Sequence, residues 1–319
     1  MGRKRNSGLE LMRLVMMFGI VAMHAAVQCA YPKDGSHWTL LDWCVCGFVF
    51  MSGYFSVKFN VRKCLNMIAL SIWCVIVSNI AQGSIVYAIK GVREYWFLWA
   101  YLLLMMLAPI IDAAFAGKDR RSIVILSAPV LFAVYVWGVM CAIPYVRDWI
   151  PSPRGLGGCT FLSLVGIYVA VKLYKLLDLG RFCTIRNAIW MLPICVIAMS
   201  VGFWWYWWIP AFVVSCFAFE GFRRMKMPST MERIVLFLSP SAFAVYLLHI
   251  TSGGLSLMSR LEMYLVEKQD WEIWVAFCVT AVGTYLICLV LDIVRRGVCG
   301  LFKMGLEHVY HEVLENQRP

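Results

Sequence analysis

The sequence predicts an all-α fold, namely a polytopic membrane bundle of about ten transmembrane helices with both termini in the cytoplasm. Three observations predict it: the composition, a series of long apolar runs and the distribution of positive charge. Of the 319 residues, 62% are hydrophobic and 15% are charged, with a mean hydropathy of +0.75. Soluble domains average about 25% charged residues. The net charge of +11 does not indicate nucleic acid as a partner, because the cations lie in short loops between apolar runs.

The apolar runs have the length that crosses a bilayer, about 17–25 residues. They cover 9–30, 38–57, 65–89, 96–115, 123–143, 158–177, 187–201, 204–222, 235–259 and 273–298. Only the motif SVGFWW separates the seventh run from the eighth. The first run follows a basic start but exceeds the roughly 7–15 apolar residues of a signal peptide, so we expect a retained span.

The positive charge orients the bundle. With a cytoplasmic N-terminus, the inner segments hold 22 of the 29 Lys and Arg residues and the outer loops hold seven. This excess follows the positive-inside rule and supports an even number of spans with both termini inside. The location expected for the chain is the bacterial cytoplasmic membrane. Residues 1–300 then form one transmembrane domain, followed by a short cytoplasmic tail, 301–319. The apolar spacing of this tail is loose, so an ordinary tail is favoured over a helix on the inner surface.

Three ionisable residues interrupt the first apolar run, LELMRLVMMFGIVAMHAA (9–26): Glu10, Arg13 and His24. Arg13 and His24 are eleven positions apart, which on a helix places them within about 20° of one face and about 16 Å apart. Glu10 lies one turn before Arg13 and is expected to pair with it. Ionisable residues inside a span are costly and indicate function. The alternative is that Glu10 and Arg13 anchor the helix at the interface while His24 bonds to a neighbouring helix.

Further motifs follow in order: FVFMSGYF (48–55), YWFLWAYLLLMMLAPIID (95–112) and SPSAFAVYLLHI (239–250). Together with the spacing of Arg13 and His24, they resemble the acyltransferase-3 family of integral membrane O-acyltransferases, over about residues 5 to 300. The resemblance implies transfer of an acyl group, usually acetyl from acetyl-CoA, to a hydroxyl. The acceptor is commonly a cell-surface or secreted glycan. No spacing of Cys and His residues indicates a metal site.

The resemblance also assigns residues. His24 takes the place of the catalytic His and Arg13 that of its basic partner, with Glu10 beside it. The positions matched to handling of the acyl donor are Ser52, Gly53 and Tyr54. Trp96, Tyr246 and the late His249 match further motif positions and are assigned to the substrate site. Two positions depart from the family: Cys46 stands where relatives often carry Asn or Asp, and Glu94 where many carry His. We therefore expect a different polar partner for His24, for which Asp42 is a candidate.

The chemistry expected of these residues is base catalysis. Neutral imidazole suits removal of the hydroxyl proton, since its reference pKa of about 6.5 lies near the working pH. Ser52 or nearby backbone amides are candidates to stabilise the oxyanion. Arg13, Lys58, Arg62 and Lys63 are suited to the phosphates of CoA. The three loop cations equally fit a role in fixing topology alone.

Two other classes of function remain open. Ten spans with buried polar residues also suit a transporter or flippase for lipid-linked sugars, or a glycan polymerase, although no inverted repeat or pair of broken spans is visible. A non-catalytic assembly partner is the third class. The sequence leaves open the acyl chain, the acceptor (a polysaccharide, a lipid-linked saccharide or a small molecule) and whether the chain forms homo-oligomers. Membrane lipids are expected partners and nucleic acids are not.

Overall fold

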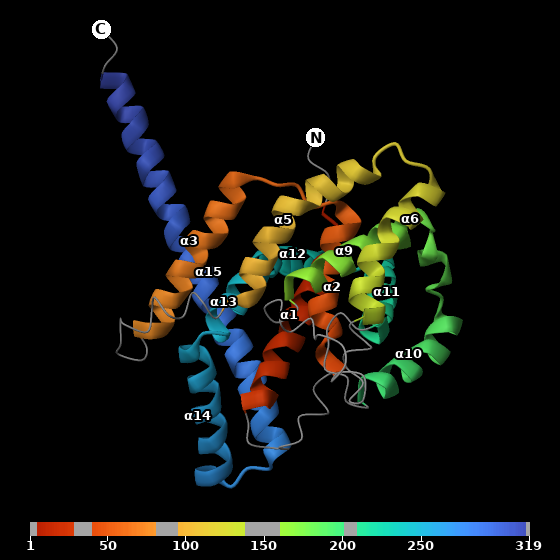
Figure 1. Cartoon of the computed structure of the whole chain (residues 1–319). Helices are drawn as coiled ribbons and strands as arrows, with labels where there is room; N and C mark the ends of the chain where they lie inside the picture. The colour runs from red at the N-terminus through yellow and green to blue at the C-terminus, as the bar shows by residue number, and fades with distance from the viewer. Residues whose placement is uncertain (1–4, 29–39, 81–94, 138–159, 201–208, 317–319) are drawn as a thin grey trace.

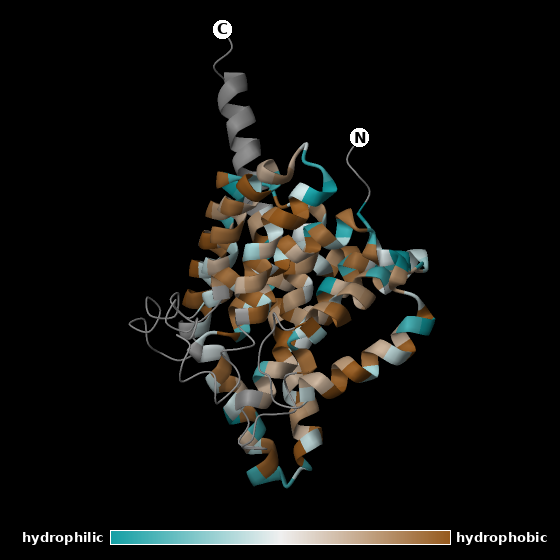
Figure 2. Ribbon diagram, turned by 45° about the vertical axis from the view of Figure 1, so that its right-hand side comes forward, coloured by the Kyte–Doolittle hydropathy of each residue, from teal (hydrophilic) through white to brown (hydrophobic). Residues whose placement is uncertain are grey.

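The computed structural model describes residues 5–28, 40–80, 95–137, 160–200 and 209–316. The regular structure in these ranges is helical, and no strand occurs among them. Hydrophobic residues dominate the ribbon through the middle of the molecule and hydrophilic ones gather toward its ends, as Figure 2 shows. The expected all-α fold is confirmed.

The α-helices are α1 (Ser7–Gln28), α2 (Trp43–Phe55), α3 (Val61–Ile80), α5 (Trp96–Phe115), α6 (Arg120–Leu131), α9 (Thr160–Leu176), α10 (Ile185–Ser200), α11 (Ile209–Arg224), α12 (Ser229–Leu238), α13 (Ala242–His249), α14 (Ser252–Gln269) and α15 (Ile273–Asn316). Three short helices complete them: η3 (Phe132–Trp137), η5 (Leu179–Phe182) and η6 (Ser239–Ser241). Each of the predicted apolar runs overlaps at least one of these helices.

Five described segments are long and apolar enough to cross a membrane: Ser7–Ala26, Val61–Ser78, Trp96–Phe115, Ser229–His249 and Ile273–Gly300. Two further apolar helices, α2 and α10, are shorter. The structure therefore supports a membrane protein. The number of ten spans and the side on which the termini lie remain predictions.

Helix α1 lies at the centre of the bundle. It contacts α2, α11, α12, α13, α14 and α15, while α9 packs against α2, α5 and α6 (Figure 1). Helix α10 packs on α11 and exposes a row of large apolar side chains, which suits contact with lipid: Ile185, Ile189, Trp190, Ile194 and Ile197. Helix α1 begins, and α15 ends, on the same side of the molecule in Figure 1.

Small residues bring α1 and α2 close together. A Cβ added to Gly19 of α1 would lie 2.5 Å from the sulfur of Cys44, and one added to Gly47 of α2 would overlap the sulfur of Met16. Close approach at small residues is how membrane helices gain packing contacts in lipid. The helix that carries Arg13 and His24 is thus held tightly against the helix that carries Ser52.

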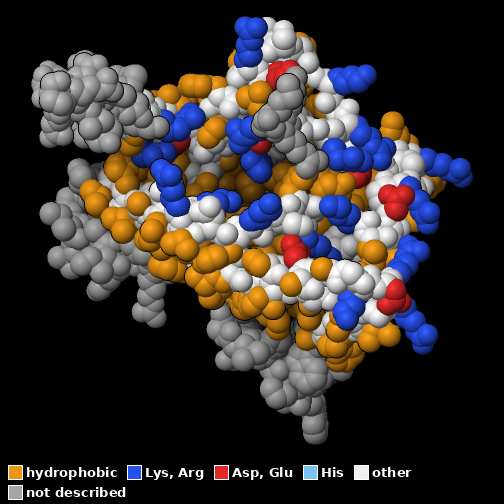
Figure 3. Space-filling model, turned by 90° about the horizontal axis from the view of Figure 1, so that it is seen from above, with side chains coloured by type: hydrophobic (Ala, Val, Ile, Leu, Met, Phe, Trp, Pro, Cys, Tyr) orange, Lys and Arg blue, Asp and Glu red, His pale blue; other side chains and the backbone are white. Residues whose placement is uncertain are grey.

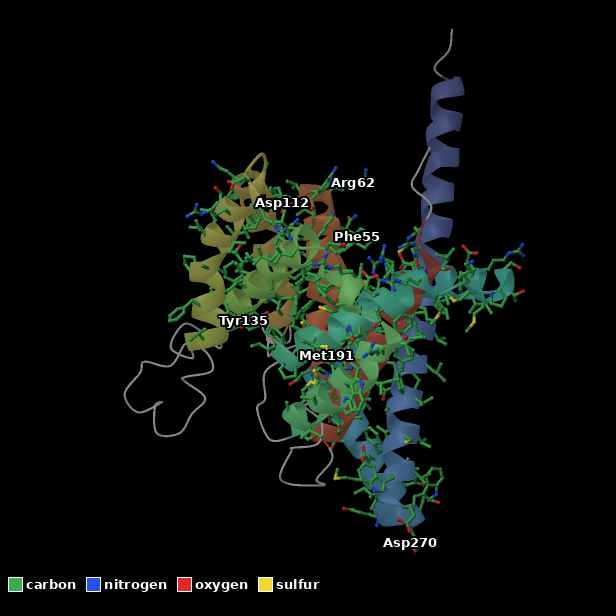
Figure 4. All side chains as sticks on the ribbon, turned by 90° about the vertical axis from the view of Figure 1, so that its right-hand side faces the viewer. Phe55, Arg62, Asp112, Tyr135, Met191 and Asp270 are labelled. Carbon is green, nitrogen blue, oxygen red and sulfur yellow. The ribbon has the colours of Figure 1, made fainter. Side chains whose placement is uncertain are left out.

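The structure corrects the predicted ninth run, 235–259, which is not one helix. It consists of the end of α12, the short η6, α13 and the start of α14, with a break after His249. Thr251 causes the break, because it has extended backbone angles and its hydroxyl caps α14 by accepting from the Gly254 amide at 3.0 Å. Helix α14 and the start of α15 form a hairpin whose tip, at Asp270, projects from the bundle (Figure 4).

The last helix continues beyond the candidate span. The span covers Ile273–Gly300, and the backbone of α15 runs on as one helix to Asn316, so residues 301–316 of the predicted tail are helical. In Figure 1 this extension projects from the side on which α1 begins.

Candidate active site

A cavity of about 870 Å³ lies between α1, α2, α3, α5, η6 and α13. Lys and Arg side chains surround a hollow with a hydrophobic floor on the face shown in Figure 3. Five basic side chains line the cavity: Arg5, Arg13, Lys58, Arg62 and Lys63. No acidic side chain is among the described residues that line it. Arg62 and Phe55 lie at the end of the molecule opposite Asp270 (Figure 4). The cavity is therefore suited to an anionic ligand at its basic end.

Arg13 and His24 line this same cavity, so the face predicted from their spacing is confirmed. One helix thus carries a cation near the mouth and an imidazole about 16 Å deeper. Glu10 is buried and pairs with Arg13, with Nη1 and Oε2 at 3.1 Å, as expected. It also pairs with Arg5, with Nε and Oε1 at 3.2 Å. Glu10 does not line the cavity; it holds the two arginines that do.

The polar partner of His24 is His249. Nδ1 of His24 lies 2.9 Å from Nε2 of His249, and Nδ1 of His249 lies 2.7 Å from the Val245 carbonyl oxygen. His249 is fully buried at the end of α13 and does not line the cavity. Asp42, the partner suggested by the sequence, lies before α2, outside the lining, and does not fill this role.

Ser52 lines the cavity, but its proton is already committed. Its hydroxyl donates to the Phe48 carbonyl at 3.0 Å, and the Tyr101 hydroxyl lies 2.9 Å away. Because a carbonyl only accepts, the proton of Ser52 points to Phe48 and Tyr101 donates to Ser52. Neither hydroxyl then has a proton left for a ligand.

Two other hydroxyls in the lining are buried without a partner. The side-chain oxygens of Tyr246 and Ser239 make no hydrogen bond to the part of the chain that the structure describes, and both residues line the cavity. Buried polar groups are normally paired, so these two hydroxyls, enclosed beside the cavity, are candidate donors to a bound ligand or water.

The comparisons with known proteins identify the family of the chain. The sequence profile of the family described as an acyltransferase domain, Acyl_transf_3, matches residues 6–293. The chain belongs to the acyltransferase-3 family. The comparisons with curated proteins and with solved structures gave no match. The chain is thus a membrane acyltransferase, and every cavity residue except Arg5 lies within the matched range.

The Ser-Gly-aromatic element of the acyltransferase divides between two surfaces. Ser52 lines the cavity, whereas Gly53 and Tyr54 do not. A Cβ on Gly53 would lie 3.0 Å from Cβ of Val171 in α9. The Tyr54 ring packs 4.5 Å from the ring of Phe219 in α11, between centroids. These two residues therefore hold α2 against α9 and α11, and any effect on the donor is indirect.

The turn after α2 carries the basic loop of the acyltransferase. Ser56 has φ +57, a left-handed conformation that a non-glycine residue adopts only when its surroundings hold it. The hydroxyl of Ser56 accepts from Lys172 Nζ at 2.7 Å, and Lys172 pairs with Asp112 at 2.7 Å. Tyr168 adds a hydrogen bond to Asp112 at 3.0 Å. Groups from α5 and α9 thus fix the turn that carries Lys58 and leads into the first turn of α3, where Arg62 and Lys63 lie.

Sequence reasoning missed Arg5, Tyr101 and Ser239 in the lining. Tyr101 and Ser239 lie inside quoted motifs, YWFLWAYLLLMMLAPIID and SPSAFAVYLLHI, so the motifs contained a signal for them. Trp96 lines the cavity at the start of α5. No group of three or more His, Cys, Asp or Glu residues suited to a metal ion occurs in the described ranges of the acyltransferase.

Proposed function

We propose that the protein transfers an acetyl group from acetyl-CoA to a hydroxyl of a cell-surface glycan or lipid-linked saccharide, in the bacterial cytoplasmic membrane. One observation carries the proposal: His24 lies in a cavity whose other end is lined by five cations. The family match supports acyl transfer in general. The charge and depth of this cavity support a CoA thioester as the donor.

The donor fits the cavity in one direction. The phosphates of CoA pair with the cations at the mouth, where guanidinium groups bind phosphate through two parallel hydrogen bonds. Lys58, Arg62 and Lys63 form no ion pair with any residue that the structure describes, and so remain available. The pantetheine arm then runs along α1 from Arg13 toward His24, past the apolar side chains of Met17 and Ile20.

The chemistry needs one base. The hydroxyl oxygen of the acceptor forms a bond to the thioester carbonyl carbon while His24 takes the hydroxyl proton. The carbon–sulfur bond breaks as the tetrahedral intermediate collapses, and the proton passes from His24 to the sulfur of CoA. The oxyanion accepts a hydrogen bond from the Tyr246 hydroxyl, which is buried, unpaired and in the lining.

The walls near His24 support a saccharide acceptor. Four aromatic side chains line this part of the cavity: Trp96, Phe97, Phe243 and Tyr246. The rings of Phe97 and Phe243 both lie against Tyr246, with centroids 5.7 Å and 6.1 Å away. Binding sites of this kind combine apolar walls with a few placed polar groups.

The test is transfer by the purified protein in lipid nanodiscs. Radiolabelled acetyl-CoA is supplied with surface glycan extracted from cells that lack the protein. Wild type is expected to move label to the glycan and release CoA. His24→Ala should bind acetyl-CoA with unchanged affinity but transfer no label. His308→Ala, outside the family match, is the control and should transfer as wild type does. Transfer by His24→Ala would overturn the assignment, and binding without turnover by wild type would indicate a non-catalytic partner.

A further inference from the structure

The two paired histidines, His24 and His249, have their protons assigned by geometry. A carbonyl only accepts, so the nitrogen of His249 that lies 2.7 Å from the Val245 oxygen, Nδ1, carries a proton. In a neutral ring the other nitrogen, Nε2, is then an acceptor. The 2.9 Å contact therefore requires His24 Nδ1 to be the donor. As a result Nε2 of His24 has no proton and keeps its lone pair.

The neutral form of His249 is the one that its surroundings favour. The residue is fully buried, and neither His249 nor His24 forms an ion pair with any acidic side chain in the described ranges. A charged ring buried without a counter-ion is costly. The chain of hydrogen bonds therefore runs in one direction, from His24 to His249 to the Val245 carbonyl.

The backbone that carries His249 is held from three sides. The last carbonyls of α13 lack partners within the helix, and side chains supply them. The Leu247 carbonyl accepts from Tyr95 at 2.8 Å, and the Leu248 carbonyl accepts from Thr251 at 3.2 Å. The Ser78 hydroxyl, whose proton goes to the Cys74 carbonyl at 2.8 Å, packs 3.4 Å from the Leu248 carbonyl oxygen.

The turn that follows packs directly on this helix end. A Cβ on Gly254 would lie 2.5 Å from the His249 carbonyl oxygen. The end of α13 is thus fixed before any ligand binds, and with it the place of the His249 ring.

We propose that His249 is a positioning residue for the reaction, an inference that rests on the proposed function. It holds His24 in the tautomer protonated at Nδ1, so that Nε2 is the nitrogen presented for the proton of the acceptor. When Nε2 takes that proton, the bond from Nδ1 to His249 becomes charge-assisted and stabilises the cation. Because the chain ends at a carbonyl, the proton is not passed on and returns from His24 Nε2 to the sulfur of CoA.

The first experiment reads the tautomers without using activity. Nitrogen-15 spectra of the full-length protein in nanodiscs, labelled at histidine, distinguish a ring protonated at Nδ1 from one protonated at Nε2. The chain has five His residues, so spectra of His24→Ala and His249→Leu assign the two rings. Wild type is expected to show both rings neutral and protonated at Nδ1. A wild-type His24 protonated at Nε2 would overturn the proposal.

The second experiment compares two substitutions of His249 in the transfer assay. His249→Gln keeps an oxygen that accepts from His24 Nδ1, whereas His249→Leu does not. We expect His249→Leu to lower kcat about 10²-fold, with KM for acetyl-CoA unchanged within about twofold, because His249 lies outside the cavity lining. His249→Gln should restore most of kcat. Equal losses of kcat in both variants would contradict the proposal.

The two proposals fail in different ways. If wild type transfers no acetyl group, the proposed function falls, and the nitrogen-15 spectrum still decides whether His249 sets the tautomer of His24. If wild type transfers acetyl but His249→Leu is as fast, the function stands and the positioning role falls. If His249→Leu does not fold, as judged by gel filtration, the wild-type spectrum and the kcat of His249→Gln decide whether His249 positions His24.

Discussion

Lys172 of α9 donates a 2.7 Å hydrogen bond to the hydroxyl of Ser56, at the end of α2, while pairing with Asp112 of α5. One ammonium group therefore joins three helices at the start of the segment that carries Lys58 and leads into Arg62 and Lys63 of α3. Ser56 holds a left-handed backbone conformation at this point. The shape of the basic end of the cavity therefore depends on Lys172, which is not itself in the lining.

Replacing Lys172 should therefore weaken donor binding and leave the chemical step intact. For Lys172→Met we expect KM for acetyl-CoA to rise about tenfold, because the cations that contact the phosphates are no longer held in place. We expect kcat to stay within about threefold of wild type. Lys118→Met, which removes an exposed charge in the turn after α5, is the control and should leave both constants unchanged. A fall in kcat alone would contradict this role. Steady-state kinetics in nanodiscs measures both constants.

The loop cations should act on the phosphates individually. Replacing Arg62 or Lys63 by Ala removes a charge-assisted contact worth about 1–1.5 kcal/mol at a partly exposed site, so KM for acetyl-CoA should rise about five- to tenfold. The effect should shrink as salt concentration rises, because exposed charges are screened. Arg120→Ala, an exposed cation at the start of α6 outside the lining, is the control. Equal effects of Arg62→Ala and Arg120→Ala would show that the loop acts only through topology or net charge.

Tyr246 and Tyr101 are expected to differ although both line the cavity. The Tyr246 hydroxyl has no hydrogen-bond partner among the described residues, and the proposed mechanism gives its proton to the oxyanion. Tyr246→Phe should therefore lower kcat about 10²-fold, the usual effect of removing one such donor. The Tyr101 hydroxyl is bonded to Ser52, and Tyr101→Phe should lower kcat less than about fivefold. Single-turnover rates compare the two variants. A larger effect at Tyr101 would mean that Ser52 and Tyr101 face the oxyanion after all.

Gly254 should be sensitive to a single methyl group. A Cβ there meets backbone carbonyls of Leu248 and His249 at 2.6 Å and 2.5 Å, and backbone does not yield easily. Gly254→Ala should therefore destabilise the protein by about 1–3 kcal/mol. Gly283→Ala in α15, where an added Cβ meets no atom within 4 Å, is the control and should be neutral or slightly stabilising. Thermal unfolding followed by tryptophan fluorescence measures the difference, and equal melting temperatures would refute it.

The face of α1 was predictable because it is a local property. Helix geometry alone relates Glu10, Arg13 and His24, and the structure contains both the ion pair and the shared cavity. The partner of His24 is not local, since His249 is 225 positions away along the chain. Nothing in the spacing of residues near His24 distinguishes His249 from Asp42, and only the packing of α13 against α1 decides between them.

The ninth apolar run shows why hydropathy overran the helix boundary. The mean hydropathy of residues 235–259 is high. One hydroxyl, that of Thr251, barely changes this mean, although it caps the start of a new helix. The local signal was present, since Thr followed by Ser and two Gly residues favours a cap and a close turn. Gly53 and Tyr54 illustrate a related limit: a motif shows that residues matter together, whereas packing shows which of them faces the cavity.

Helix α1 also sets a length. Arg13 and His24 stand on one uninterrupted helix. The helix therefore fixes the distance between the cation that binds the anionic end of the donor and the base at its reacting carbonyl. Inserting one residue between them would turn His24 by about 100° out of the cavity and move it by only about 1.5 Å. Inserting seven would return it to nearly the same face about 10 Å deeper. Both changes should abolish transfer, because the first turns His24 away from the cavity and the second carries it away from His249.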